Sequence, residues 1–155
     1  MKHLPSETTT SAWARLMLAQ RHALNQAERA LKDAGLPALA WYDVLLELDR
    51  AGRDGLRPGA LERALLLRQY NLSRQIDRME AAGLVARRPY RDDARGQVLH
   101  ITAAGRCIRK RMWPVYAAAI ETAVGKRLSA AERSELARLL GKLLPSDIAG
   151  DGDSP

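Results

Sequence analysis

The chain has 155 residues, of which 46% are hydrophobic and 28% are charged, a composition typical of one globular domain and not of a disordered chain. It contains no run of about eighteen apolar residues and no apolar stretch near its start, which excludes a membrane span and argues against a signal peptide. Its single cysteine, Cys107, cannot form an internal disulfide and indicates a reducing, cytoplasmic compartment.

The net charge of +7 is concentrated in the middle of the chain. Between Arg50 and Arg111 there are 15 basic and 6 acidic residues, a net +9, whereas the rest has 10 basic and 12 acidic residues, a net −2. Fourteen of those 15 basic residues are arginine, whose guanidinium matches phosphate and carboxylate geometry. This asymmetry indicates a polyanionic partner, and a solvated basic surface without a partner is the alternative.

The first predicted helix covers residues 6–34, where Ser6 or one of Thr8 to Thr10 can cap its start and Gly35 can end it. Its apolar stripe consists of Trp13, Leu16, Met17, Gln20, Leu24, Ala27 and Leu31. A second helix is predicted over residues 38–51. The turn-rich stretch GRDGLRPG, with room for a very short strand, then precedes two shorter helices over residues 58–66 and 69–82.

Two short strands, LVARRPY and QVLHIT, follow and are joined by the hairpin loop RDDARG. A helical segment after Thr102 reaches about residue 124, and Pro114 predicts a kink or break inside it. Ser129 and Glu132 form a capping box that opens a last helix, which ends near Leu144. Residues 145–155 are expected to be an acidic, disordered tail.

This order predicts one mainly α chain, residues 1–155, with a small antiparallel β-hairpin. Two short helices followed by a hairpin make a winged helix-turn-helix, here residues 38–102. The long helices that flank it, in residues 6–37 and 103–144, carry apolar stripes that need burial. A second copy of the chain is the simplest partner for these stripes, so the flanking helices are predicted to form a dimerisation region.

The helix predicted over residues 69–82 carries a candidate reading surface. Leu72, Ile76 and Met79 recur at helical spacing and are expected to face the core. The remaining face then presents hydrogen-bonding groups and charges: Tyr70, Asn71, Ser73, Arg74, Asp77 and Arg78. Arginine can bond guanine and asparagine can bond adenine in the major groove, so this face can recognise a DNA sequence. An ordinary solvated helix face is the alternative.

The hairpin gathers Arg87, Arg88, Arg91 and Arg95 in or beside one short loop. Asp92 and Asp93 offset part of the repulsion between these charges, and a phosphate backbone can offset the rest. An arginine at such a tip can enter a narrow minor groove, a role that we assign to Arg95. We expect Asp93 to hold the loop or a nearby arginine, and a simple turn cap is the alternative.

The stretches EAAGLVARR, DDARG and LHITAAG, together with LAWYDVLLEL, resemble the MarR family of transcriptional regulators, the multiple-antibiotic-resistance repressor type. The resemblance extends over nearly the whole chain. It implies a homodimer that binds a pseudo-palindromic operator in double-stranded DNA and represses transcription. It also implies release by a small aromatic or phenolic ligand, or by oxidation.

Site residues are implied by the same resemblance. DNA contacts from the recognition helix and the wing fall on Tyr70, Asn71, Ser73, Arg74, Arg78, Arg88, Arg91 and Arg95, and the structuring wing aspartate is Asp93. The chain departs from the family pattern at Ala94, where many members have another arginine. It departs again at Gln97, where an apolar residue is commoner, which predicts a weaker wing strand at that end.

A ligand cleft is implied where the flanking helices meet the DNA-binding lobe. The candidates are Trp13, His22, Trp41 and Tyr42, with Trp113 and Tyr116 on the same set of helices. For each aromatic residue the alternative is a core position, and for His22 it is exposure to solvent. Thiol sensing at Cys107 also resembles a family property, but its place early in a helix favours buried packing.

No pattern in the sequence indicates an enzyme, a cofactor or a metal site. The chain lacks a phosphate-binding glycine loop, a nucleophile elbow and a helical His-x-x-x-His pair, and His3, His22 and His100 are scattered. We therefore expect a cytoplasmic, nucleoid-associated prokaryotic regulator that works without a cofactor. The alternatives are a winged-helix protein-interaction module that binds no nucleic acid, and a redox-sensing regulator that acts through Cys107.

Overall fold

The structure is a computed structural model that describes residues 4–90 and 93–145, without the side chains of residues 93–95. Its elements, in chain order, are α1 (Glu7–Asp33), α2 (Leu39–Ala51), α3 (Pro58–Ala64), α4 (Leu72–Ala81), β1 (Val85–Tyr90), β2 (Asp93–Ile101), α5 (Ala103–Ile120), the π-helical turn η1 (Glu121–Gly125) and α6 (Ala130–Gly141). The strands pair antiparallel, so the predicted mainly α fold with a small β-hairpin is confirmed. No helix in these ranges is long and apolar enough to cross a membrane.

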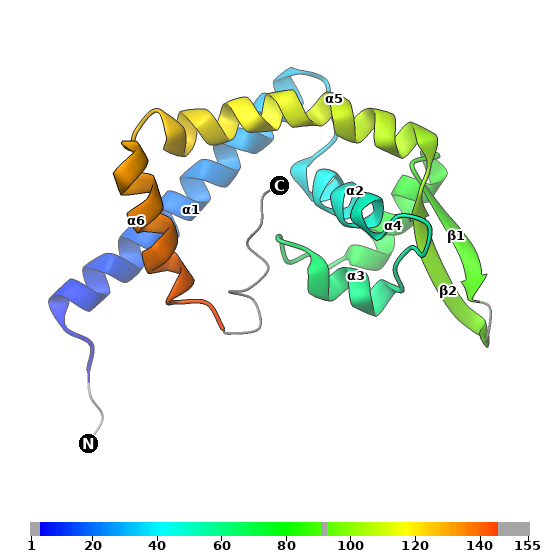
Figure 1. The fold of residues 1–155 in the computed structure, drawn as a ribbon, viewed down its shortest axis with the longest axis horizontal. Helices are drawn as coiled ribbons and strands as arrows, with labels where there is room; N and C mark the ends of the chain where they lie inside the picture. The colour runs from blue at the N-terminus through cyan, green and yellow to red at the C-terminus, as the bar shows by residue number, and fades with distance from the viewer. Residues whose placement is uncertain (1–3, 91–92, 146–155) are drawn as a thin grey trace.

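The chain forms an arch and a lobe (Figure 1). The arch consists of α1 and α5, which pack against each other, with α6 turned downward at its far end. The lobe consists of α2, α3, α4 and the hairpin, and it lies beneath the other end of α5. The hairpin projects from the lobe on the side away from α6.

The lobe is built around an apolar core to which every one of its elements contributes. The buried members are Val44, Leu45, Leu48, Leu61, Ile76, Met79, Leu84, Val85, Leu99 and Ile101. On α4 the predicted inward face is confirmed, since Ile76 and Met79 are buried and Leu72 packs partly buried against the same core. This packing turns the opposite face of α4 outward.

A second core lies where α1, α2 and α5 meet. It contains Ala27, Leu31, Leu39, Tyr42, Met112 and Ala119. Ile108 on α5 packs against both cores, and α2 contributes buried side chains to both. The lobe is therefore fixed to the arch through α2 and the middle of α5.

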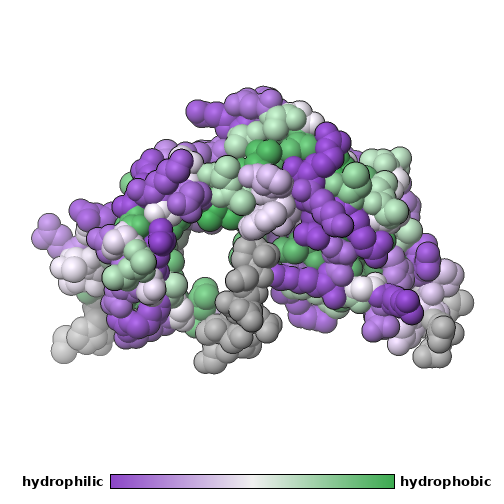
Figure 2. Space-filling view, turned by 45° about the horizontal axis from the view of Figure 1, so that its top comes forward, coloured by the Kyte–Doolittle hydropathy of each residue, from purple (hydrophilic) through white to green (hydrophobic). Residues whose placement is uncertain are grey.

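The far end of the arch leaves apolar side chains uncovered. On α1, Ala27 and Leu31 are buried, whereas Trp13 and Leu18 in the N-terminal half are 65% and 54% exposed. α6 has no buried residue, and Leu136, Leu139, Leu143 and Leu144 in and just after it are exposed. Figure 2 shows apolar patches between polar side chains on this end of the arch, which is separated from the lobe by an open space.

One residue of the segment before α3 forms an isolated β-bridge with the hairpin. Leu56 pairs with Leu99 through two backbone hydrogen bonds, of 3.0 and 2.8 Å between nitrogen and oxygen, as the short-strand prediction for GRDGLRPG anticipates. Gly55 makes this approach possible: its φ is +65°, and a Cβ there would lie 2.5 Å from the carbonyl oxygen of Leu99. The hairpin is thereby anchored to the base of α3.

The structure differs from the sequence predictions at the hairpin loop and, in part, at Pro114. β2 begins at Asp93, so the loop predicted over residues 91–96 is shorter than expected, and the register shifts between Pro89 and Tyr90 beside Gln97. Of the kink or break predicted at Pro114, the break does not occur, since α5 runs without interruption to Ile120. Proline leaves the carbonyl of Lys110 without its helical partner, but Lys110 is exposed, so water can satisfy that carbonyl.

Candidate nucleic-acid interface

The helix that carries the candidate reading residues begins later than its sequence predicts. α4 starts at Leu72, and Asn71 before it has φ −121° and ψ 40°, outside the helical region. The prediction of a helix from residue 69 is therefore wrong, and Tyr70 and Asn71 lie in the turn before it. The segment before α4 is held by α2 instead: the backbone N–H of Leu67 donates to the Asp43 carboxylate, and the Gln69 side chain donates to the carbonyl of Ala40.

The predicted contact residues of this segment all lie at the surface. Ser73, Arg74 and Arg78 are exposed on the face of α4 opposite the buried Ile76 and Met79. Asn71 is exposed at the start of the helix, and Tyr70 is 89% exposed with the guanidinium of Arg68 over its ring. The structure thus brings five hydrogen-bonding or cationic side chains to one end and one face of α4: Tyr70, Asn71, Ser73, Arg74 and Arg78.

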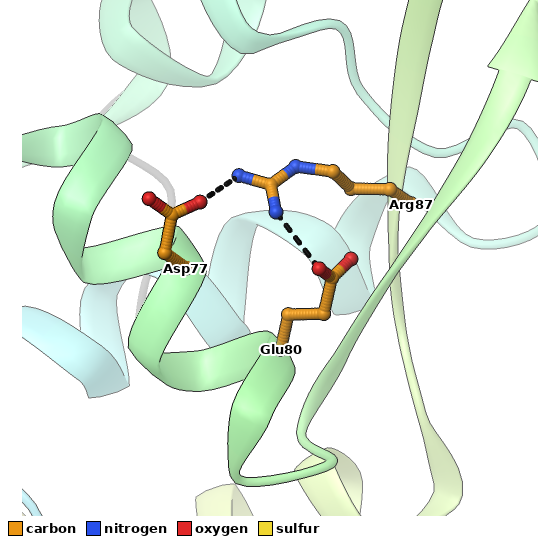
Figure 3. A network of polar contacts seen from close by, with 3 residues as sticks. All are labelled: Asp77, Glu80 and Arg87. Carbon is orange, nitrogen blue, oxygen red and sulfur yellow. Dashed lines mark hydrogen bonds and ion pairs between the residues drawn. The ribbon is translucent and has the colours of Figure 1, made fainter.

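Arg87 on β1 has a different role from the other arginines of the hairpin. Its Nη2 atom lies 2.6 Å from the Asp77 carboxylate and its Nη1 atom 2.9 Å from the Glu80 carboxylate, both on α4 (Figure 3). The hydrogen bond that Arg87 donates to Asp77, followed by the charge of Glu80, raises the pKa of Arg87 above its usual range. Arg87 therefore ties the hairpin to α4, a role that the simple count of arginines in the loop did not reveal.

Other arginines of this surface are free to meet an external anion. Within the described part of the chain, no carboxylate forms an ion pair with Arg74, Arg78 or Arg88, and all three are exposed. Arg57, at the start of α3, lies with its guanidinium 4.8 Å from the centre of the Tyr90 ring at the end of β1. α3, α4 and the hairpin therefore each carry exposed arginines: Arg57 at the start of α3, Arg74 and Arg78 on α4, and Arg88 on β1.

Three predicted wing residues lie wholly or partly outside the described residues. Arg91 is outside them altogether, and for Asp93 and Arg95 only the backbone, in β2, is described. Their roles stay predictions from the sequence.

Comparison with known proteins shows which fold the chain has and which family its middle segment matches. A sequence model of the MarR family matches residues 34–96, which include all of α2, α3, α4 and β1. The structure is similar to that of AbsC, a MarR family transcriptional regulator from Streptomyces coelicolor, with 27% sequence identity, a TM-score of 0.79, and coverage of 92% of this chain and 95% of that one. Residues 34–96 thus match the MarR family in sequence, and the chain as a whole has the fold of its members. No curated protein matches it in sequence.

Two further MarR-family structures were solved with DNA. Sco3205, a transcriptional regulator from Streptomyces coelicolor in complex with DNA, is 26% identical, with a TM-score of 0.79 and coverage of 94% of this chain and 97% of that one. A mutant of MarR from E. coli, complexed with operator DNA, is 25% identical, with a TM-score of 0.74 and coverage of 85% and 93%. The winged helix-turn-helix prediction is confirmed by these similarities, and the chain resembles the transcriptional regulators of the MarR family.

Of the four ligand-binding candidates, Tyr42 alone lies in an aromatic cluster within the described part of the chain. Its ring centre is 6.2 Å from that of Trp113, which stacks on it, and 5.2 Å from that of Tyr116, which meets it edge-on. Trp41 points elsewhere and donates a hydrogen bond to the Gln75 side chain on α4. Trp13 and His22 are exposed on α1, so the structure does not bring them to this cluster.

Two open hollows in the structure lie away from these candidates. One, of about 400 Å³, lies between α3, α4 and the hairpin, and its lining includes Glu62, Ser73 and Arg87. The other, of about 460 Å³, lies between α1 and α5, and its lining includes Gln26 and Pro114. Neither is lined by Trp13, His22, Trp41 or Tyr42.

Asp43 is a buried acid that sequence reasoning missed. Its side chain lies at the junction of lobe and arch, is only 5% exposed, and accepts a hydrogen bond of 2.7 Å from the backbone N–H of Leu67. Burial raises the pKa of its carboxyl, although the N–H groups of Leu67 and Leu66 and the charge of Arg50 act in the opposite direction. The sequence does contain a signal for this residue, since LAWYDVLLEL places an acid between apolar neighbours. An acid that is buried in such a position needs a specific hydrogen-bonding partner.

The raised pKa of Asp43 predicts a pH dependence of stability. The folded protein binds the proton of this carboxyl more tightly than the unfolded chain does, so its contribution to stability is fully present below the ordinary value of 3.8 and is lost as pH rises through the raised folded pKa. Asp43→Asn does not titrate. Urea denaturation from pH 4 to 7 should therefore show the free energy of unfolding of the wild type rising relative to that of Asp43→Asn as pH falls. A difference between the two proteins that does not change with pH would contradict a raised pKa for Asp43.

Cys107 is exposed, and the prediction of buried packing for it is wrong. Gly105 and Met112 are buried on the inward face of α5 and Ile108 is partly buried there, which directs Cys107 outward. The thiol is therefore accessible, as the redox-sensing alternative requires.

Among residues 4–90 and 93–145, no group of three or more His, Cys, Asp or Glu side chains is placed to hold a metal ion.

Proposed function

We propose that the protein represses transcription by binding a pseudo-palindromic operator in double-stranded DNA as a homodimer, and that a small aromatic or phenolic ligand releases it. The observation that carries the proposal is the surface on which α4 and the hairpin stand together. It holds exposed arginines without carboxylate partners in the described chain, beside a helix that fits the major groove. Two relatives of this fold were solved with DNA.

In this proposal the two elements have different tasks. α4 lies in the major groove, where Asn71 and Arg74 contact base edges and Tyr70 and Ser73 contact phosphates or base edges. Arg78, Arg88 and Arg91 contact phosphates, and Arg95 at the tip of the hairpin enters the minor groove while Asp93 structures the loop. Specificity would then come from α4, and much of the affinity from the hairpin.

The uncovered far end of the arch supports the homodimer. A globular chain rarely leaves large apolar side chains such as Trp13, Leu18, Leu139 and Leu143 in water without a partner surface. A twofold dimer through α1 and α6 buries these residues twice, once on each copy. It also presents two copies of α4, which can occupy half-sites about 34–36 Å apart, one turn of the duplex.

The proposed ligand site is the junction between α2, which belongs to the lobe, and α5, which belongs to the arch. Tyr42, Trp113 and Tyr116 supply flat aromatic rings there, and burial raises the pKa of both tyrosine hydroxyls. Trp41 lies next to Tyr42 in the chain, and Trp13 and His22 remain candidates from the sequence. We propose that the protein acts by binding and not by catalysis, in the cytoplasm and at the nucleoid.

Selection of bound duplexes from a random pool tests this function. We expect one duplex with two related half-sites to be enriched. We also expect a small phenol to release the protein from this duplex, which a screen of small phenols against the complex would measure. Arg74→Ala should then lose about 1–3 kcal/mol of discrimination at one base-pair position in each half-site. Arg95→Ala should weaken binding to many sequences more evenly. If both variants keep wild-type affinity and salt dependence, this assignment of contacts is wrong.

Arg87 and its neighbour Arg88 provide a matched pair of substitutions. Both changes to alanine remove one positive charge from β1, but Arg87 is already paired with Asp77 and Glu80 whereas Arg88 is exposed. Arg88→Ala should reduce the slope of log affinity against log salt by about 1, because one phosphate contact is lost. Arg87→Ala should leave that slope nearly unchanged and lower the stability of the hairpin. Equal slopes in the two variants would show that Arg87 also contacts phosphate.

A further inference from the structure

The segment between α3 and α4, residues 65–71, leads the chain into the proposed reading surface. α4 begins without a local cap, because Asn71 occupies the N-cap position but its side chain makes no capping hydrogen bond. An asparagine at this position commonly accepts a hydrogen bond from the first turn and fixes where the helix begins. In α4 the starting point must therefore be set by contacts with other parts of the protein.

Three polar groups in the first turns of α2 make these contacts, and we call Ala40, Trp41 and Asp43 the α2 clamp. Their hydrogen bonds are from Leu67 N to Asp43 Oδ2 at 2.7 Å, from Gln69 Nε2 to the Ala40 carbonyl at 3.0 Å, and from Trp41 Nε1 to Gln75 Oε1 at 2.8 Å. The first two hold the segment before α4, and the third holds α4 itself. One turn of α2 thus fixes both sides of the helix start.

The clamped segment also connects the two cores. Leu65 packs against the lobe core. Leu67 packs against the second core, where α1, α2 and α5 meet and to which Tyr42 and Trp113 also contribute. The backbone N–H of Leu67 is the group that Asp43 holds. Asp43 therefore fixes the position of α4 relative to the arch as well as relative to the lobe.

Asp43 is an unfavourable residue for stability alone. Its carboxyl is removed from water at a site between apolar side chains, and packed apolar residues commonly stabilise such sites as well as or better than a buried ionisable group. The acid supplies what an apolar residue cannot, a directed acceptor for a backbone N–H that has no helical or strand partner. Asp43 therefore contributes chiefly by fixing the position of the segment before α4.

We propose that the α2 clamp, with Asp43 at its centre, positions the recognition helix for sequence-specific binding. The proposal rests on the proposed function of α4. Base contacts require the side chains of α4 to be placed accurately, whereas phosphate contacts by flexible arginines tolerate small displacements. A defect in the clamp should therefore weaken binding to the operator and leave binding to random DNA almost unchanged.

The test compares two probes, the duplex that the wild type selects from a random pool and a random-sequence duplex of the same length. Asp43→Ala should lower affinity for the selected duplex about 10- to 100-fold, as expected when a buried N–H loses its charged acceptor. Affinity for the random duplex and its salt slope should stay within about twofold of wild type. Asp43→Asn keeps an acceptor oxygen at the same place and should restore most of the selectivity.

Two further variants separate positioning from general stability. Asp49 lies on the same helix, but its carboxylate pairs with Arg106 and Arg109 on α5 at 3.1 and 2.7 Å. Asp49→Ala should lower the thermal midpoint and leave the ratio of selected to random affinity unchanged. Trp41→Phe keeps an aromatic side chain, although a smaller one, and removes the N–H that donates to Gln75, so it should lower that ratio even if Asp43→Ala does not fold. The proposal is overturned if Asp49→Ala lowers the ratio as much as the clamp variants, or if the clamp variants leave it unchanged.

Hydrogen exchange tests the clamp without DNA. The amide of Leu67 should be protected in the wild type and in Asp43→Asn, and should lose protection in Asp43→Ala while the amides of α2 keep theirs. If the wild type selects no duplex over random DNA, the proposed function fails, and this experiment still decides whether Asp43 holds the segment. Unchanged protection of Leu67 in Asp43→Ala would overturn the clamp even where operator binding is observed.

Discussion

Gly105→Val is expected to leave little folded protein at 25 °C, and Gly105→Ala to lower the free energy of unfolding by about 1–3 kcal/mol. A Cβ atom at this position would lie 2.3 Å from the carbonyl oxygen of Leu84 and 2.8 Å from a side-chain carbon of Ile101. The oxygen belongs to the backbone and cannot rotate away, so α5 or the start of β1 has to move. Urea denaturation followed by circular dichroism measures the loss.

Gly141→Ala is the matched control for these substitutions. Gly141 is the last residue of α6, and a Cβ there meets no atom within 4 Å. Alanine restricts the unfolded chain more than glycine does and favours helix, so this variant should be as stable as the wild type or more stable by a few tenths of a kcal/mol. If Gly105→Ala is equally neutral, the contact between α5 and the turn after α4 is looser than the structure indicates.

The position of Gly105 explains part of the LHITAAG stretch in physical terms. Thr102 caps α5 by accepting the N–H of Gly105, and its hydroxyl also donates to the carbonyl of Gly83 at 2.7 Å. Gly105 then allows the first turn of α5 to pack directly on the backbone of Leu84 and on Leu45 of α2. The end of the hairpin, the turn after α4 and the start of the arch are thereby joined at one point.

Most of the fold could be predicted because its signals are local. The period of Leu72, Ile76 and Met79, the cap at Ser6 and the capping box of Ser129 and Glu132 each depend on residues a few positions apart, and the structure contains all of them. Predictions failed where distant residues decide. The segment before α4 is held by contacts with α2, more than twenty positions away in the chain.

The candidate site shows the same division. Its exposed cationic face follows from the periodicity of α4, so Ser73, Arg74 and Arg78 could be placed from the sequence. The pairing of Arg87 with Asp77 and Glu80 could not, because it depends on the angle at which β1 leaves the turn after α4. Asp43 was visible as an acid between apolar residues, but its partner, the N–H of Leu67, is backbone and leaves no trace in the sequence.

Leu99→Ala is expected to lower the free energy of unfolding by about 2–5 kcal/mol, because it leaves a cavity in the lobe core at a side chain that is fully buried. Gln97→Ala, two residues earlier on β2 and exposed, should change stability by less than about 0.5 kcal/mol. Urea denaturation of both variants measures the difference. A loss of similar size in Gln97→Ala would mean that the hairpin, and not the core, is the weak element.

The same variant decides whether the lobe and the arch unfold together. Ile108 packs against both cores and α2 contributes to both, so loss of lobe stability should be transmitted to α1 and α5. Circular dichroism and hydrogen exchange of the α5 amides should then report one transition at the same urea concentration. If the α5 amides stay protected after the lobe has unfolded, the arch is stable by itself, most simply through contacts between two copies of the chain. In that case the lobe is carried by a dimer whose stability does not depend on it.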